Sequence, residues 1–134
     1  MCSFGRRIAR EVIQRYGTRD MNELCACLGI SLHEVPLRRL VGFVDHDDSG
    51  AFIIVNHSLP VFVKRFVVAH EVGHYVIHPR DVGFFWIMEK THFYLARLEK
   101  HADDFACELL EISEHDYDKA KEYIRAYGRE PAFV

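Results

Sequence analysis

Two histidines four residues apart frame the segment His70-Glu71-Val72-Gly73-His74. On a helix, residues i and i+4 lie one above the other on the same face, so both imidazoles could reach one metal ion. Glu71 would then lie beside that ion, where a general base is needed. This spacing is typical of zinc hydrolases, although five residues alone make a short signature.

Two acidic residues interrupt the apolar stripe of the next expected helix. That stripe follows the i, i+3, i+4, i+7 rule through Leu95, Leu98, Ala102, Ala106, Leu109 and Leu110. Glu99 falls inside it, and Asp103 lies one turn later on the same face. Carboxylates that face a core need cationic partners, so we predict Glu99 as a third metal ligand. Asp103 is predicted to accept the free N–H of a ligating imidazole. The alternative makes both residues salt-bridge partners of Arg97 or Lys100 on a solvated face.

Two histidines and a glutamate would leave one coordination position open to water, as catalytic zinc sites do and structural ones do not. Zn²⁺ is the expected metal, and Mn²⁺, Fe²⁺ or Co²⁺ would also suit these ligands. Glu71 is then the predicted catalytic residue, taking a proton from water and passing it to the leaving amine. The competing interpretation is a pair of core histidines that bond only to the backbone.

The elements that must position these residues follow from apolar periodicity and from capping residues. We expect helices over residues 4–16, 20–29, 58–77, 94–111 and 113–128. Ser58 is expected to cap the helix that carries His70, with Pro60 in its first turn. A strand over residues 30–37 and hairpin arms over 40–45 and 51–56 predict a small antiparallel sheet. The order predicts one α+β domain over residues 1–134, with the sheet packed on the central helix.

Composition excludes several classes of protein. The chain has 134 residues, of which 49% are hydrophobic and 28% charged, and it is long enough to bury a core. Its net charge of −3 gives no basic footprint, so direct nucleic-acid binding is not expected. Neither an export signal nor a membrane span is apparent. The four cysteines lack framework spacing, which favours reduced thiols and a cytoplasmic location. Nothing indicates an oligomeric state.

The first motif and a second one downstream together resemble the ImmA/IrrE family of metallopeptidases. The second motif consists of Glu99, Ala102, Asp103, Phe105, Ala106, Leu109 and Leu110, which is similar to the family's E-x-x-A-[ND]-x-F-A-x-x-L-L. The resemblance spans approximately residues 4–110 and implies a minimal zincin core with glutamate as the third ligand. It also implies a protein partner, because members commonly cleave helix-turn-helix repressors. One departure is Glu111-Ile112-Ser113, where the family usually places a proline.

The resulting hypothesis is a cytoplasmic zinc-dependent endopeptidase that cleaves a helix-turn-helix repressor of a mobile element or stress regulon. The alternative is a non-catalytic metal-binding antirepressor or toxin–antitoxin accessory that acts by protein binding. Ligand geometry is common to both. His78 continues the i+4 series without an assigned role, and spacing does not select one of Tyr94, Tyr117, Tyr123 and Tyr127 as an oxyanion partner.

The strand over residues 51–56 directly precedes the metal-binding helix, and short connections place neighbouring elements side by side. The family resemblance implies that this strand is a sheet edge that pairs with the backbone of an extended substrate. The alternative is an internal strand, paired on both sides by the segments that begin at Ile30 and Leu40.

Overall fold

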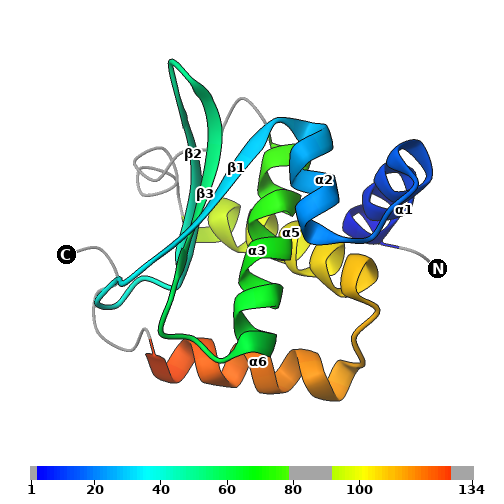
Figure 1. The fold of residues 1–134 in the computed structure, drawn as a ribbon. Coiled ribbons are helices and arrows are strands. Elements are labelled where there is room, and N and C mark those ends of the chain that lie inside the picture. Colours follow the sequence, from blue (N-terminus) through cyan, green and yellow to red (C-terminus); the bar gives the residue numbers. More distant parts are fainter. Residues whose placement is uncertain (1–2, 79–91, 128–134) are drawn as a thin grey trace.

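The computed structural model describes residues 3–78 and 92–127, with the backbone alone for residues 92–95. The elements are α1 (Phe4–Tyr16), α2 (Met21–Leu28), β1 (Ile30–Val35), β2 (Gly42–Asp47), β3 (Gly50–Asn56), α3 (Val61–Ile77), α5 (His92–Leu110) and α6 (Glu114–Tyr127). In these residues two helices precede a sheet and three helices follow it (Figure 1). The predicted α+β class is confirmed.

Most helix ends lie where capping chemistry predicts them. Gly17 and Gly29 end α1 and α2 with φ angles of 70° and 73°, in the left-handed region that glycine favours. Ser113 caps α6 by accepting from the backbone N–H of Asp116. The prediction for α3 is wrong, because Pro60 is its N-cap residue and no side chain caps it. Ser58 instead donates its N–H to the Asn56 side chain, so the helix begins later.

The sheet is mixed, which corrects the predicted antiparallel arrangement. Its order is β1-β3-β2, with β2 antiparallel and β1 parallel to β3. The segment that connects β1 to β2 therefore passes across the end of β3. The buried Asn56 holds this crossing, because its Nδ2 donates to the carbonyls of Leu37 and Leu40. β3 is consequently the central strand, and the prediction that it forms a free edge is wrong.

Helix α3 stands between the sheet and α5, and α6 lies across its N-terminal end (Figure 1). The α3 side chains that point into this core include Val63, Phe66, Val67 and Val72, as expected for a helix that is apolar on nearly every side. α3 approaches α5 closely at Gly73, where a Cβ atom would lie 3.1 Å from the fully buried ring of Phe105. This contact brings the two predicted motifs together.

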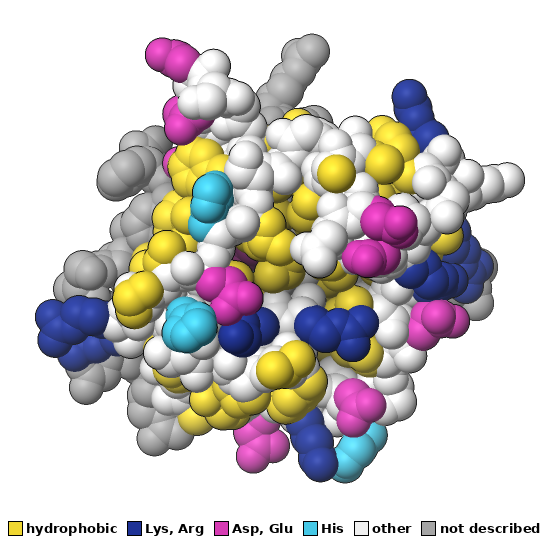
Figure 2. Space-filling view, viewed as in Figure 1, with side chains coloured by type: hydrophobic (Ala, Val, Ile, Leu, Met, Phe, Trp, Pro, Cys, Tyr) yellow, Lys and Arg dark blue, Asp and Glu magenta, His cyan; other side chains and the backbone are white. Residues whose placement is uncertain are grey.

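The one face drawn in Figure 2 and the described helices agree with the expectations from composition. On the face drawn in Figure 2, acidic, basic and histidine side chains are interspersed rather than gathered into one basic patch. Among the described residues, no helix combines the length and the hydropathy that a membrane crossing requires.

Candidate metal centre

Two helices bring His70, His74 and Glu99 together. His74 Nε2 lies 2.7 Å from Glu99 Oε1, and His70 Nε2 lies 3.2 Å from Glu99 Oε2. One ligand atom from each residue lies within 4.8 Å of the other two. In the parts of the chain that the structure describes, this is the one such group of three or more His, Cys, Asp or Glu residues.

The donor set fits a divalent metal. Two imidazole nitrogens and one carboxylate converge from two packed helices, and this His₂Glu set matches that of catalytic zinc sites. The histidines are buried, whereas the Glu99 side chain is 45% exposed. The salt-bridge alternative does not describe Glu99, which contacts both imidazoles, while Lys100 pairs with Asp104. Metal ligation by these residues stays a prediction.

Electrostatics in the metal-free site favours a protonated imidazole beside an ionised carboxylate. Burial alone would lower the pKa of His70, but the charge of Glu99 and the hydrogen bond to Asp103 raise it well above the usual value. Burial alone would raise the pKa of Glu99, but both histidines hold it well below the usual value. Without a metal ion, the neighbouring carboxylates therefore favour the protonated form of the His70 imidazole.

Glu71 lies beside the two histidines in a buried position, with 8% of its surface exposed. Burial raises its pKa, which the neighbouring His70 and His74 and a backbone hydrogen bond from Val44 partly oppose. A carboxyl group with a raised pKa is better matched to proton exchange near neutral pH than an exposed one. The structure thus places the predicted general base in a suitable environment.

Asp103 contacts His70 as predicted. Its Oδ1 lies 2.7 Å from His70 Nδ1, so the carboxylate accepts the Nδ1–H and leaves Nε2 directed at Glu99. Burial would raise the pKa of Asp103, but His70, Lys121 and Tyr117 together lower it. Sequence reasoning named Tyr117 only as one of four possible oxyanion partners and did not predict that Tyr117 or Lys121 contacts Asp103. Nothing in their spacing shows which helix they face.

His78 and His101 extend the histidine cluster beyond the candidate ligands. Their rings stack at 5.8 Å between centroids, and His78 lies 5.7 Å from His74. His101 also packs edge-on against Phe4 and is partly buried. This packing gives His78 a structural contact. The side chain of Tyr94 lies outside the described residues.

We expect zinc binding to strengthen as the pH rises through the neutral range. Because His70 holds its proton in the metal-free protein, a metal must displace that proton. One released proton makes the dissociation constant fall about tenfold per pH unit until the pH reaches the pKa of His70. Glu99 stays ionised throughout this range and adds no further dependence.

Chelator competition at pH 6, 7 and 8 would measure this slope, and calorimetry in buffers of different ionisation enthalpy would count the protons released. The exposed His115 provides a control, because His115→Ala should leave the slope unchanged. A pH-independent affinity without proton release would contradict the assigned protonation of His70.

Comparisons with known proteins agree with this geometry. Residues 25–130 match the model of the Peptidase_M78 family, the IrrE N-terminal-like domain. The chain is 32% identical over 102 residues to "Uncharacterized immunity region protein 2" of Bacillus phage phi105, covering 75% of this chain and 64% of that protein. It is 29% identical over 132 residues to "Metallopeptidase ImmA" of Bacillus subtilis (strain 168), covering 93% of this chain and 78% of that protein.

Proposed function

The chain belongs to the IrrE N-terminal-like family of metallopeptidases, and on that premise we propose that it is a zinc-dependent endopeptidase. The observation that carries the proposal is the convergence of His70, His74 and Glu99, with the buried Glu71 beside them. A closed structural site would need a fourth protein ligand, and the cluster among the described residues has three.

The chain's own residues divide the chemistry between them. Zinc, when bound by the three ligands, would supply a Lewis acid that polarises the scissile carbonyl and acidifies water. Glu71 accepts the proton of the attacking water and returns it to the leaving amine. The hydrogen bond from Val44 orients the Glu71 carboxylate. Asp103 orients His70 so that Nε2 faces the site.

The proposed substrate is a helix-turn-helix repressor of a mobile element. Two observations support it. One is the family resemblance, and the other is that a relative from Bacillus phage phi105 is named an immunity region protein. The net charge of −3 favours a protein substrate over DNA as the molecule that this chain contacts.

Incubation of the zinc-loaded protein with a repressor encoded beside its gene tests the proposal. Mass spectrometry should detect two repressor fragments from one cleavage, and a chelator should prevent their formation. Release of intact repressor from its operator, without fragments, would refute the peptidase and favour the non-catalytic antirepressor.

The substrate backbone is proposed to pair with β2, since β3 is internal. In an antiparallel pair, hydrogen-bonded residues alternate with residues whose N–H and C=O point to the other side. Asn56 donates to the carbonyl of Val41, so Gly42, Val44 and His46 fall in the outward-pointing set. Val44 is also the residue that bonds to Glu71. Among the described residues no strand pairs with the outer edge of β2, which runs past Glu71, so a strand added there would bring its peptide bond to the general base.

We expect repressor binding to protect the β2 amides from hydrogen exchange. The inactive variant Glu71→Gln would hold the uncleaved repressor during the measurement. Protection should increase most at Gly42, because the outward-pointing N–H groups of Val44 and His46 already have acceptors and an added strand would accept from the N–H of Gly42. The opposite sheet edge, β1, is the internal control. Protection of Ile30–Val35 with no change in β2 would place the substrate at β1 and contradict the proposed pairing with β2.

A further inference from the structure

Helix α6 presents two polar side chains to the candidate metal centre. Tyr117 and Lys121 are four residues apart and so lie on one face of the helix. Ala120 and Ile124 lie on the same side, and they pack against the core. That packing brings Tyr117 and Lys121 to the buried Asp103 of α5, which has 4% of its surface exposed.

Both oxygens of the Asp103 carboxylate have partners. Oδ1 accepts from His70 Nδ1 at 2.7 Å. Oδ2 accepts from the Tyr117 hydroxyl at 2.7 Å and lies 3.0 Å from Lys121 Nζ. The path from α6 to the candidate ligand thus consists of short charge-assisted contacts, which are stronger than those between neutral groups.

We propose that Tyr117 and Lys121 are positioning residues that hold Asp103, and through it the His70 imidazole, in the orientation required for metal binding. The inference rests on the metal site of the proposed function and extends it to α6. The physical reason is that a carboxylate held at only one oxygen can rotate about its own axis. That rotation would release the His70 ring from its fixed orientation.

Lys121 has a second effect, because its charge balances that of a buried carboxylate. Its side chain is 22% exposed, while that of Asp103 is 6% exposed, so the ammonium group reaches inward from the surface. A buried charge without a partner is costly, so this contact stabilises the carboxylate that accepts the Nδ1–H of His70.

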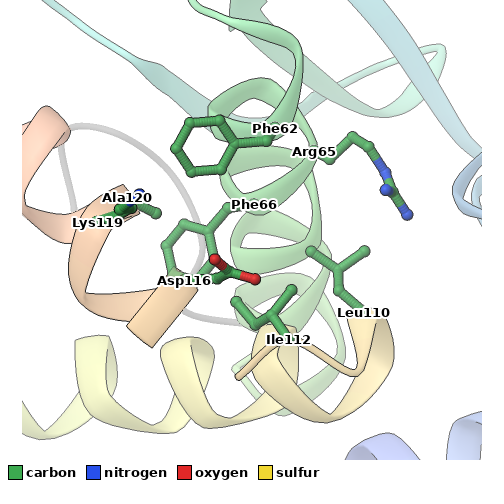
Figure 3. Close-up of a pocket in the computed structure, with 8 residues that line it drawn as sticks. All are labelled: Phe62, Arg65, Phe66, Leu110, Ile112, Asp116, Lys119 and Ala120. Carbon is green, nitrogen blue, oxygen red and sulfur yellow. The ribbon is translucent and has the colours of Figure 1, made fainter. Parts of the chain in front are cut away.

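Packing fixes the Tyr117 ring. Phe66 of α3 meets it edge-on, with 5.8 Å between the ring centroids, and lies 6.2 Å from the His70 ring. Figure 3 shows Phe62 and Phe66 projecting from α3 beside Asp116, at the start of α6. Phe66 therefore separates the surface pocket at this end of α3 from the hydrogen bonds around Asp103. The edge-on contact with Phe66 thus supports the ring that carries the Tyr117 hydroxyl.

Zinc affinity provides the first test. Tyr117→Phe removes only the hydroxyl, and Lys121→Met removes the ammonium group with its charge and its donors. Each should raise the zinc dissociation constant about three- to tenfold, and the double variant up to about a hundredfold, the upper range for loss of a partner that orients a ligand. Controls on the same helix are Tyr123→Phe and Lys119→Met, at exposed positions that make no recorded contact with Asp103. Both controls should bind zinc as the parent protein does.

A second measurement uses the metal-free protein, so it does not depend on catalysis or on zinc. Nitrogen-15 NMR of the imidazoles should show altered Nδ1 and Nε2 shifts for His70 in both variants, and unaltered shifts in the controls. Unchanged His70 signals together with unchanged zinc affinity would overturn the inference. A parent protein that binds no zinc would refute the proposed function instead, while the metal-free spectra would still test the role of α6. Lys121→Met, at a partly exposed position, retains the aromatic packing if Tyr117→Phe fails to fold.

Discussion

Replacing Glu71 by glutamine should abolish peptide hydrolysis while zinc binding is retained. Glutamine has nearly the same size, and its carbonyl oxygen can still accept the hydrogen bond from Val44. It has no basic oxygen, so it cannot take the proton of the attacking water. Loss of a positioned general base lowers rates by about 10²- to 10⁴-fold, which would bring turnover to background. Repressor cleavage and bound zinc would both be measured on the same sample.

A matched control is Glu122→Gln, which makes the same chemical change at an exposed position of α6. It should cleave at the normal rate. If Glu71→Gln lost its zinc together with its activity, Glu71 would have a structural role in the site. A variant that kept both zinc and full activity would remove Glu71 from the mechanism.

Replacing Glu99 by alanine should weaken zinc binding by more than about a hundredfold. Residues that only orient a ligand already account for about 10- to 100-fold in affinity, and Glu99 is proposed to contact the metal directly. The substitution also removes a carboxylate that lies within 3.2 Å of both imidazoles. Competition with a chromophoric chelator would measure the dissociation constant.

Glu99→Asp and Glu122→Ala provide the comparison. Aspartate keeps the charge but shortens the side chain by one methylene group, so its affinity should lie between those of the parent and the alanine variant. Glu122→Ala should bind zinc normally. Parent-like affinity in Glu99→Ala would exclude Glu99 as the third ligand, and another residue would then have to complete the site with the two histidines.

The site was more predictable from the sequence than the sheet, for a physical reason. The i, i+4 spacing of His70 and His74 is a local property of a helix, and Glu99 and Asp103 stand out because they interrupt an apolar stripe. These features place polar groups on one face without any knowledge of the fold. The structure accordingly brings all four residues together.

The remaining errors concern contacts between elements that are distant in the chain. Strand order depends on how the segment between β1 and β2 crosses β3, and the buried Asn56 sets that crossing through its side chain. The same residue delays the start of α3 beyond Ser58. A single asparagine at a strand end carries no signal of this kind in sequence. For the same reason the sequence did not show where α6 packs, so the contacts of Tyr117 and Lys121 with Asp103 were not predicted.

The contact between Gly73 and Phe105 has a consequence for how members of the family diverge. Position 73 performs no chemistry in the proposed mechanism, yet a Cβ atom there would press on a fully buried ring. Volume in a packed core is conserved more strictly than identity. Relatives with a larger residue at this position should therefore carry a smaller one at the position of Phe105, so the two motifs should covary as a pair. The distance between α3 and α5 would then depend on the combined volume of these two residues, rather than on each motif separately.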